Sequence, residues 1–124
     1  MTGSFKLAWQ TGQTAAYAVV SLSGRWEEKP EWRIEIPAGV SRYWAIGVEF
    51  GFQVFCEAVL AREGTRRRGL IVQVEDVVTQ PVDTTAKAVA YATFRALCDA
   101  TGLDGRGAFT FDEQSGRFVL SRGT

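Results

Sequence analysis

The stretch from Gly69 to Gly102 constrains the fold most, because it contains a strand, a tip and a capped helix in sequence order. The run from Gly69 to Thr79 is rich in β-branched residues, and the apolar Val72 and Val74 flank the polar Gln73. Such enrichment and alternation predict an extended strand with one buried face. A helix is predicted in the second half of the stretch.

That helix is predicted to begin shortly after Pro81 and to end at Gly102. Proline disfavours the helical region for the residue before it, Gln80, so the helix starts later. Asp83 or Thr84 is expected to supply the capping side-chain oxygen, and glycine commonly follows the last helical turn. One side of the helix is expected to be buried and the other more exposed; the buried set is Ala88, Val89, Ala92, Phe94 and Leu97, and the exposed set is Lys87 and Arg95.

The composition predicts one domain spanning residues 1–124, with no catalytic, cofactor-binding or metal site. Hydrophobic residues make up 46% of the 124 residues, which is enough for a core. Lys+Arg and Asp+Glu number 14 each, so no overall basic field attracts DNA or an anionic membrane. Histidine, the commonest general base and metal ligand, is absent. Cys56 and Cys98 lie in apolar contexts and are expected to be buried thiols.

The amino-terminal residues show no export signal, in which a charged segment precedes an apolar one. No apolar run in the sequence approaches the roughly 20 residues needed to span a bilayer. A cytoplasmic protein without membrane contact is therefore expected.

Further strands are predicted before and after the central unit. Residues 4–10 and 17–23 predict two strands joined by a polar turn, and residues 32–36 alternate apolar with polar side chains as in a strand with one buried face. Within residues 106–122, two short apolar runs flank the segment Asp112–Gly116, which predicts a terminal β-hairpin.

The region from Arg42 to Glu63 is ambiguous. Every even position from Trp44 to Leu60 is apolar, which suits a strand, whereas polar side chains at four-residue spacing suit a helix. We favour a largely buried helix with a narrow polar stripe, because a strand of this length would far exceed the usual 3 to 10 residues. The alternative is a long hairpin whose turn is residues 63–68.

Few side chains suggest chemistry. Arg66, Arg67 and Arg68 form the only dense charge run, and they could contact phosphate or carboxylate groups or simply lie in a solvated loop. The carboxylates are scattered, and no pair is fixed at a spacing that requires acid–base chemistry. Asp83 and Glu49 have the more constrained settings, in a cap and in an apolar segment.

Three separated blocks of the sequence resemble the fourth domain of bacterial elongation factor G and its ribosomal-protection relatives. The similarity covers residues 4–102 and leaves the terminal hairpin outside it. The blocks, in order, are Gln10-Thr11-Gly12 followed by Tyr17-Ala18-Val19-Val20, then Val48-Glu49-Phe50-Gly51-Phe52, and Gln80-Pro81-Val82-Asp83-Thr84-Thr85 with Ala88.

The resemblance implies the α+β fold of the second domain of ribosomal protein S5: a mainly antiparallel sheet with two helices on one face and a left-handed crossover. It also implies that two tip loops contact the ribosome or RNA, here Gly12–Ala16, with Gly12, Gln13 and Thr14 at its head, and Thr79–Pro81, with Gln80 and Pro81. The basic groups of the family's tips are replaced, the arginine of the first loop by uncharged residues and the histidine of the second by Gln80.

Three hypotheses about function remain. The chain is a non-catalytic module that binds the ribosome or RNA through its tip loops, or a protein-interaction or homo-oligomeric module that has lost RNA binding. The third is a small-molecule binder or enzyme, for which the fold class offers only an analogy. Uncharged tips together with an exposed apolar patch elsewhere would favour the second.

Overall fold

The structure is a computed structural model that describes residues 1–62, 68–105 and 107–121. It has the α+β class, the mainly antiparallel sheet, the two helices and the terminal hairpin that the sequence predicts. The elements in chain order are β1 (Thr2–Thr11), β2 (Thr14–Glu27), β3 (Trp32–Glu35), α1 (Arg42–Phe55), a π-helical turn η1 (Cys56–Leu60), β4 (Gly69–Val78), α2 (Ala86–Thr101), β5 (Phe109–Asp112) and β6 (Arg117–Leu120).

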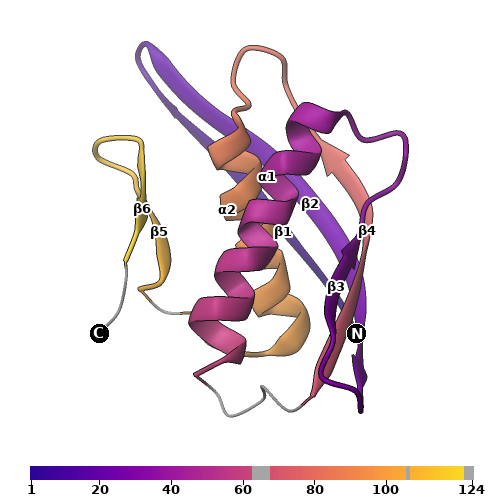
Figure 1. The fold of residues 1–124 in the computed structure, drawn as a ribbon. Coiled ribbons are helices and arrows are strands. Elements are labelled where there is room, and N and C mark those ends of the chain that lie inside the picture. Colours follow the sequence, from indigo (N-terminus) through magenta and orange to yellow (C-terminus); the bar gives the residue numbers. More distant parts are fainter. Residues whose placement is uncertain (63–67, 106, 122–124) are drawn as a thin grey trace.

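Four of the strands form one sheet in the order β1-β2-β4-β3 (Figure 1). The β1–β2 and β2–β4 pairs are antiparallel, whereas β3 and β4 are parallel. Parallel neighbours require a crossover connection, and α1 lies in the segment that provides it. A register shift between Ser21 and Leu22 bends the β2–β4 pair.

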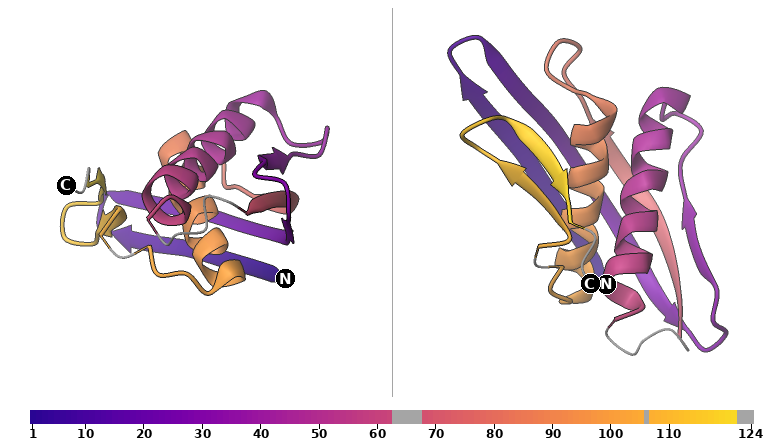
Figure 2. Two further views of the ribbon diagram at one scale, coloured as in Figure 1. Left: turned by 60° about the horizontal axis from the view of Figure 1, so that its bottom comes forward. Right: turned by 60° about the vertical axis from the view of Figure 1, so that its left-hand side comes forward.

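Both helices cover the same face of this sheet (Figures 1 and 2). Helix α2 packs on β1 and β2, and α1 packs beside α2. This layering explains the burial along β2, where Ala18, Val20 and Leu22 are buried and the residues between them are partly exposed.

The two helices approach so closely that α1 requires glycine at two positions one turn apart. A Cβ atom at Gly47 would lie 2.6 Å from the carbonyl oxygen of Ala86, and one at Gly51 would overlap the carbonyl oxygen of Ala90. Backbone atoms cannot turn aside as a flexible side chain can. The two glycines therefore set the distance between α1 and α2.

Residues 42–60 are helical, so the helix interpretation is correct and the long hairpin is not. Ser41 caps α1 by accepting a hydrogen bond from the Trp44 amide. The strand-like alternation arises because apolar residues occupy the exposed face as well as the buried one. Ile46 and Phe50 lie on that exposed face.

The helical segment Arg42–Leu60 is 19 residues long and contains an 18-residue window with a mean hydropathy of 1.2, so it is, by length and composition, apolar enough to cross a membrane. The expectation that no apolar run approaches this length is therefore wrong here. A core helix of a soluble protein meets the same two criteria, and α1 packs against α2. A membrane role does not follow.

Helix α2 begins one or two residues later than predicted. Thr85, not Asp83 or Thr84, is the N-cap, and its hydroxyl accepts a hydrogen bond from the Ala88 amide at 3.1 Å. Asp83 and Thr84 instead connect the preceding loop to β2. The carboxyl end is as predicted, with Gly102 in the left-handed region at φ 70°.

The β5–β6 hairpin packs against α2 and β1 through aromatic side chains. The ring centroids of Tyr91 and Phe109 are 5.4 Å apart, as are those of Trp9 and Phe111. The indole Nε1 of Trp9 donates to the carbonyl oxygen of Glu113 at 3.0 Å. Edge-to-face pairs of this kind add to the free energy of apolar burial.

Candidate functional site

The two tip loops lie at the same end of the molecule (Figure 1), and hydrogen bonds join β2 to the segment that follows the second loop. The amide of Tyr17 in β2 donates to the carbonyl oxygen of Asp83 at 3.1 Å. The hydroxyl of Thr84 donates to the carbonyl oxygen of Tyr17 at 2.6 Å and accepts from the amide of Gln80 at 2.8 Å. Thr84 is thus the central residue of the connection.

Gly12, Gln13 and Thr14 are exposed at the end of the β1–β2 hairpin, and Gln80 and Pro81 are exposed in the loop before α2. The loop meets the hairpin at Tyr17, so the contact lies below the hairpin's end. A shallow cavity of about 270 Å³ lies at the contact and is lined by Ala8, Trp9, Gln10, Ala15, Ala16, Tyr17, Gln80 and Asp83. Neither loop contains a basic residue.

Replacing Thr84 with valine is expected to lower the free energy of unfolding by about 2 kcal/mol, because the Tyr17 carbonyl and the Gln80 amide lose their partner. Valine has nearly the same shape, so packing changes little. Thr84→Ser keeps the hydroxyl and is expected to retain most of the stability. Chemical denaturation of both variants measures the difference, and equal losses would contradict the role of the hydroxyl.

The arginine run is only partly described. Arg66 and Arg67 lie outside the described residues. Arg68 precedes β4, at the end of that strand opposite the tip loops; its guanidinium lies 4.9 Å from the centroid of the Trp26 ring, and its carbonyl oxygen accepts from the Trp32 indole at 3.0 Å. Arg68 therefore lies far from the tip loops.

The groups considered for catalysis do not come together in the described parts of the chain. Glu49 is exposed on α1, and Asp83 is half-buried beside the tip loops. Burial raises the pKa of the Cys56 thiol to about 12 and that of the Cys98 thiol to about 11, so both are neutral thiols at physiological pH. No group of three or more His, Cys, Asp or Glu side chains in these parts could hold a metal ion.

An exposed apolar stripe that sequence reasoning missed runs along α1. Tyr43 is 58% exposed, Ile46 54% and Phe50 42%, at the spacing that places side chains on one face of a helix. Leu120 of β6 is also exposed, at 46%. Residues 42–60 contain more apolar residues than one buried helix face can hold, and this surplus was the sequence signal for the exposed stripe.

Two separate open cavities lie between α1 and the terminal hairpin, and we call the surface that they mark out the furrow. Tyr43 and Phe50 of the stripe line these cavities, whereas Ile46 lines neither. The lower cavity, about 540 Å³, has apolar and polar residues in its lining. The α1 and η1 side carries Phe50, Val54 and Ala58 together with Gln53 and Glu57, and Arg62, Ala108, Leu120 and Ser121 complete it. The upper cavity, about 650 Å³, is lined by Tyr43, Thr85, Ala86, Lys87, Gly116, Arg117 and Phe118.

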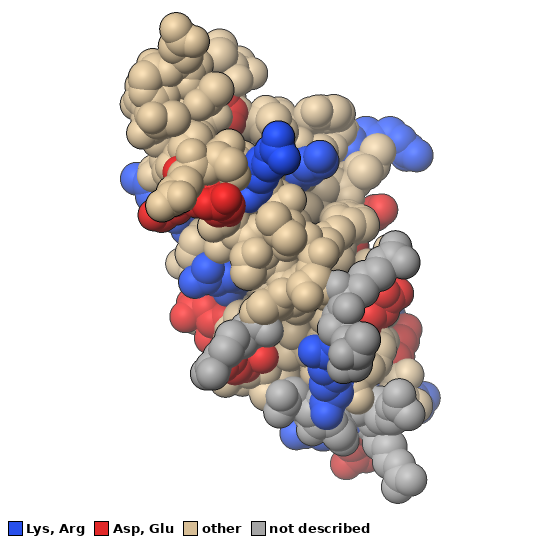
Figure 3. Space-filling model, turned by 90° about the vertical axis from the view of Figure 1, so that its left-hand side faces the viewer, with Lys and Arg blue, Asp and Glu red and all other residues tan. Residues whose placement is uncertain are grey.

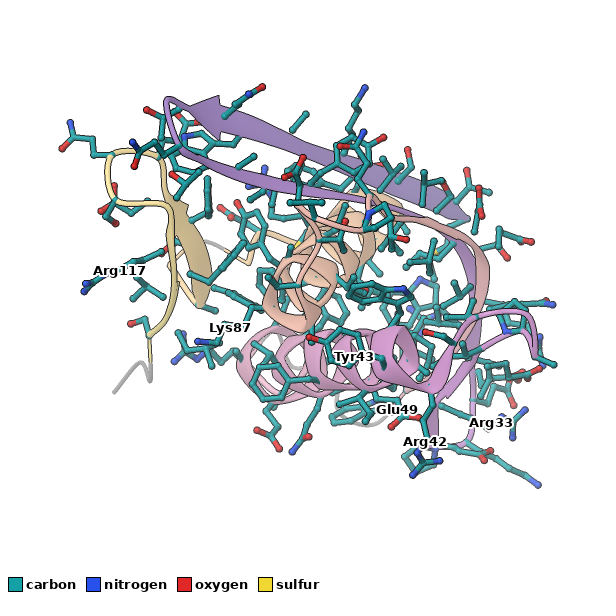
Figure 4. The ribbon with its side chains drawn as sticks, turned by 90° about the horizontal axis from the view of Figure 1, so that it is seen from above. Arg33, Arg42, Tyr43, Glu49, Lys87 and Arg117 are labelled. Carbon is teal, nitrogen blue, oxygen red and sulfur yellow. The ribbon has the colours of Figure 1, made fainter. Side chains whose placement is uncertain are left out.

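The upper end of the furrow is basic. Figure 3 shows basic side chains at the upper end of a mostly uncharged surface on this side of the molecule. In Figure 4, Lys87 lies between the hairpin and α1, whereas Arg117 extends from the hairpin on the side away from α1. Within residues 1–62, 68–105 and 107–121, neither side chain forms a salt bridge.

The comparisons with known proteins support the fold. No family model and no curated protein matches the chain. A crystal structure from Thermus thermophilus is similar, with a TM-score of 0.57 and 23% sequence identity. The similarity covers 96% of this chain, which spans 16% of the length of that protein. The fold is therefore the size of one domain within a longer protein.

Proposed function

We propose that this chain is a non-catalytic binding module that engages a protein partner through the furrow between α1 and β6. The exposed apolar stripe carries the proposal, because Tyr43, Ile46 and Phe50 remain outside the core on one helix face. Contiguous apolar surface on a small protein usually marks an interaction site. Leu120 on the opposite wall gives the furrow two apolar sides.

Contact with the ribosome or RNA through the tip loops is a second candidate. It is favoured by the position of both loops at one end of the molecule, where hydrogen bonds join β2 to the segment that follows the second loop, and by the sequence resemblance to the fourth domain of elongation factor G. Phosphate contacts supply most of the affinity for nucleic acid, and both loops lack basic side chains. The furrow is therefore the better-supported surface.

Site-specific photocross-linking separates the two candidates. A photoreactive residue at Phe50 probes the furrow, one at Gln80 probes the tip, and one at Gln73, exposed on the open face of the sheet, is the control. We expect protein adducts at Phe50 only, lost when Leu120→Asp is added. A product of twice the chain mass would identify a second copy as the partner.

The opposite pattern would overturn the proposal. Adducts with ribosomal components at Gln80, with none at Phe50, would assign function to the tip. Co-sedimentation with ribosomes at low salt that is lost in the double variant Gln13→Ala, Gln80→Ala would confirm that assignment independently. Equal labelling at Gln73 and Phe50 would show that the contacts are nonspecific.

A further inference from the structure

The β5–β6 hairpin ends in a strand whose outer edge has no strand partner in the part of the chain that the structure describes. β6 pairs only with β5 among the described strands. The Ser121 amide donates to the Ala108 carbonyl across the hairpin at 3.0 Å, which fixes the phase of the alternating hydrogen bonds. Arg117 and Val119 consequently direct their backbone groups toward β5. The backbone N–H and C=O groups of Phe118 and Leu120 face away from it.

This free edge follows the furrow. Residues of β6 line both cavities, with Phe118 in the upper one and Leu120 in the lower one. In the right-hand view of Figure 2, β6 lies between β5 and the helices. A strand added to β6 would therefore run along α1, between a row of backbone hydrogen-bonding groups and a helix face on which Phe50 and Val54 lie beside Gln53 and Glu57.

The charges of the furrow restrict what could occupy it. Lys87 and Arg117 border the upper cavity from two different elements, and no salt bridge neutralises them within the described parts of the chain. Asp112, the cross-strand partner of Arg117, accepts a hydrogen bond from the Ser115 hydroxyl at 2.8 Å. This bond and, to a smaller extent, the charge of Arg117 lower the pKa of the Asp112 carboxyl, so the charge of Arg117 is partly compensated within the hairpin. The upper end therefore offers Lys87 and Arg117 to an acidic group. The lower end offers Phe50, Val54 and Leu120 to apolar side chains, with Gln53, Glu57 and Arg62 beside them.

We infer that β6 takes up an extended peptide segment as a third strand of the hairpin sheet, with an acidic side chain near Lys87 and Arg117 and apolar side chains against Phe50 and Val54. The inference rests on the proposed function and names the chemistry of its partner. Strand addition to an exposed edge is an established mode of peptide recognition, in which the backbone contributes affinity and alternate side chains contribute specificity.

The test uses the full chain and a phage-displayed library of random linear nine-residue peptides. We expect the selected peptides to contain an acidic residue and apolar residues at alternate positions. Peptide binding should slow hydrogen exchange at the Phe118 and Leu120 amides about tenfold or more. The Val119 amide, already bonded to β5, should change less. In an added strand, every second peptide amide points toward β6. N-methylation of one of these amides should weaken binding about tenfold, and N-methylation of an amide that points away should change it little.

Two variants test the side-chain contacts. Lys87→Glu combined with Arg117→Glu is expected to weaken the selected peptides about tenfold, because attraction becomes repulsion. Lys29→Glu, an exposed lysine outside the furrow, should leave the affinity unchanged. Phe50→Asp should abolish measurable binding, and circular dichroism should show that this half-exposed position tolerates the change.

The outcomes distinguish this inference from the proposed function. Peptides that need Phe50 but bind without protecting the Phe118 and Leu120 amides would overturn strand addition and leave the interaction surface in place. A library that yields no binder would overturn the peptide inference even where Phe50 cross-links a folded protein. Absence of both library binders and Phe50 adducts would overturn both proposals.

Discussion

Replacing Gly51 with alanine is expected to lower the free energy of unfolding by about 3 kcal/mol, although alanine is the better helix former by about 1 kcal/mol. The added methyl group would overlap the Ala90 carbonyl oxygen and lie 3.0 Å from the Thr93 Cβ. The helices must therefore separate, and the packing along their whole contact loosens. Thermal and chemical denaturation measure the loss.

Gly39 supplies the matched control for this substitution. A Cβ atom there meets nothing within 4 Å, so Gly39→Ala is expected to change stability by less than about 1 kcal/mol. Gly47→Ala, where the new atom lies 2.6 Å from a carbonyl oxygen, should fall between the two variants. A stabilising Gly51→Ala would show that the helices can move apart at little cost.

Replacing Phe94 with alanine is expected to lower the free energy of unfolding by about 3 to 5 kcal/mol. Only 1% of Phe94 is exposed, and its ring contacts α1 and the hairpin together: its centroid lies 6.2 Å from that of Phe55 and 5.7 Å from that of Phe109. The truncation leaves a cavity where three elements meet. Denaturant titration followed by circular dichroism measures the effect.

Tyr43→Ala removes a side chain of similar size from a position that is 58% exposed, and it is expected to cost less than about 1 kcal/mol. The comparison separates loss of core packing from loss of an aromatic ring as such. A cost below about 1 kcal/mol for Phe94→Ala would mean that the surrounding residues collapse into the space.

Local rules were sufficient to predict the stretch from Gly69 to Gly102 except for its cap. The strand ends at Val78 and the helix ends at Gly102, close to the predicted bounds. Three successive residues, Asp83, Thr84 and Thr85, all have side chains able to cap a helix. A tertiary contact decides among them, because the Thr84 hydroxyl donates a hydrogen bond to the carbonyl oxygen of Tyr17, a residue distant in the sequence.

The sequence pattern of residues 42–60 suited both a helix and a strand because apolar residues also lie on the exposed face of the helix. A single helix face accounts for the buried Val48, Phe52 and Phe55, whereas Ile46 and Phe50 fill even positions on the exposed side and imitate a strand. Surplus apolar residues on a helix are thus a signal of an interaction surface. Sequence alone could not show that β6 forms the opposite wall, because that depends on how the hairpin packs.

The two candidate sites differ in how far the sequence located them. The tip loops were placed by resemblance, and the contact between Tyr17 and the loop before α2 brings them together. The furrow has no sequence motif, because its lining comes from residues 43–62, 85–87 and 108–121, which are distant along the chain. Its chemistry follows from burial and backbone direction, which only the folded chain defines.

The aromatic attachment of the terminal hairpin has a thermodynamic consequence. In the described residues, its strands share no backbone hydrogen bond with the four-stranded sheet, and side chains such as Trp9 and Tyr91 hold it in place. The hairpin can therefore release as a unit at a lower cost than global unfolding. Release of the hairpin would remove one wall of the furrow. Ligand binding in the furrow and attachment of the hairpin are therefore linked equilibria, so a bound ligand stabilises the attached hairpin and the attached hairpin favours ligand binding.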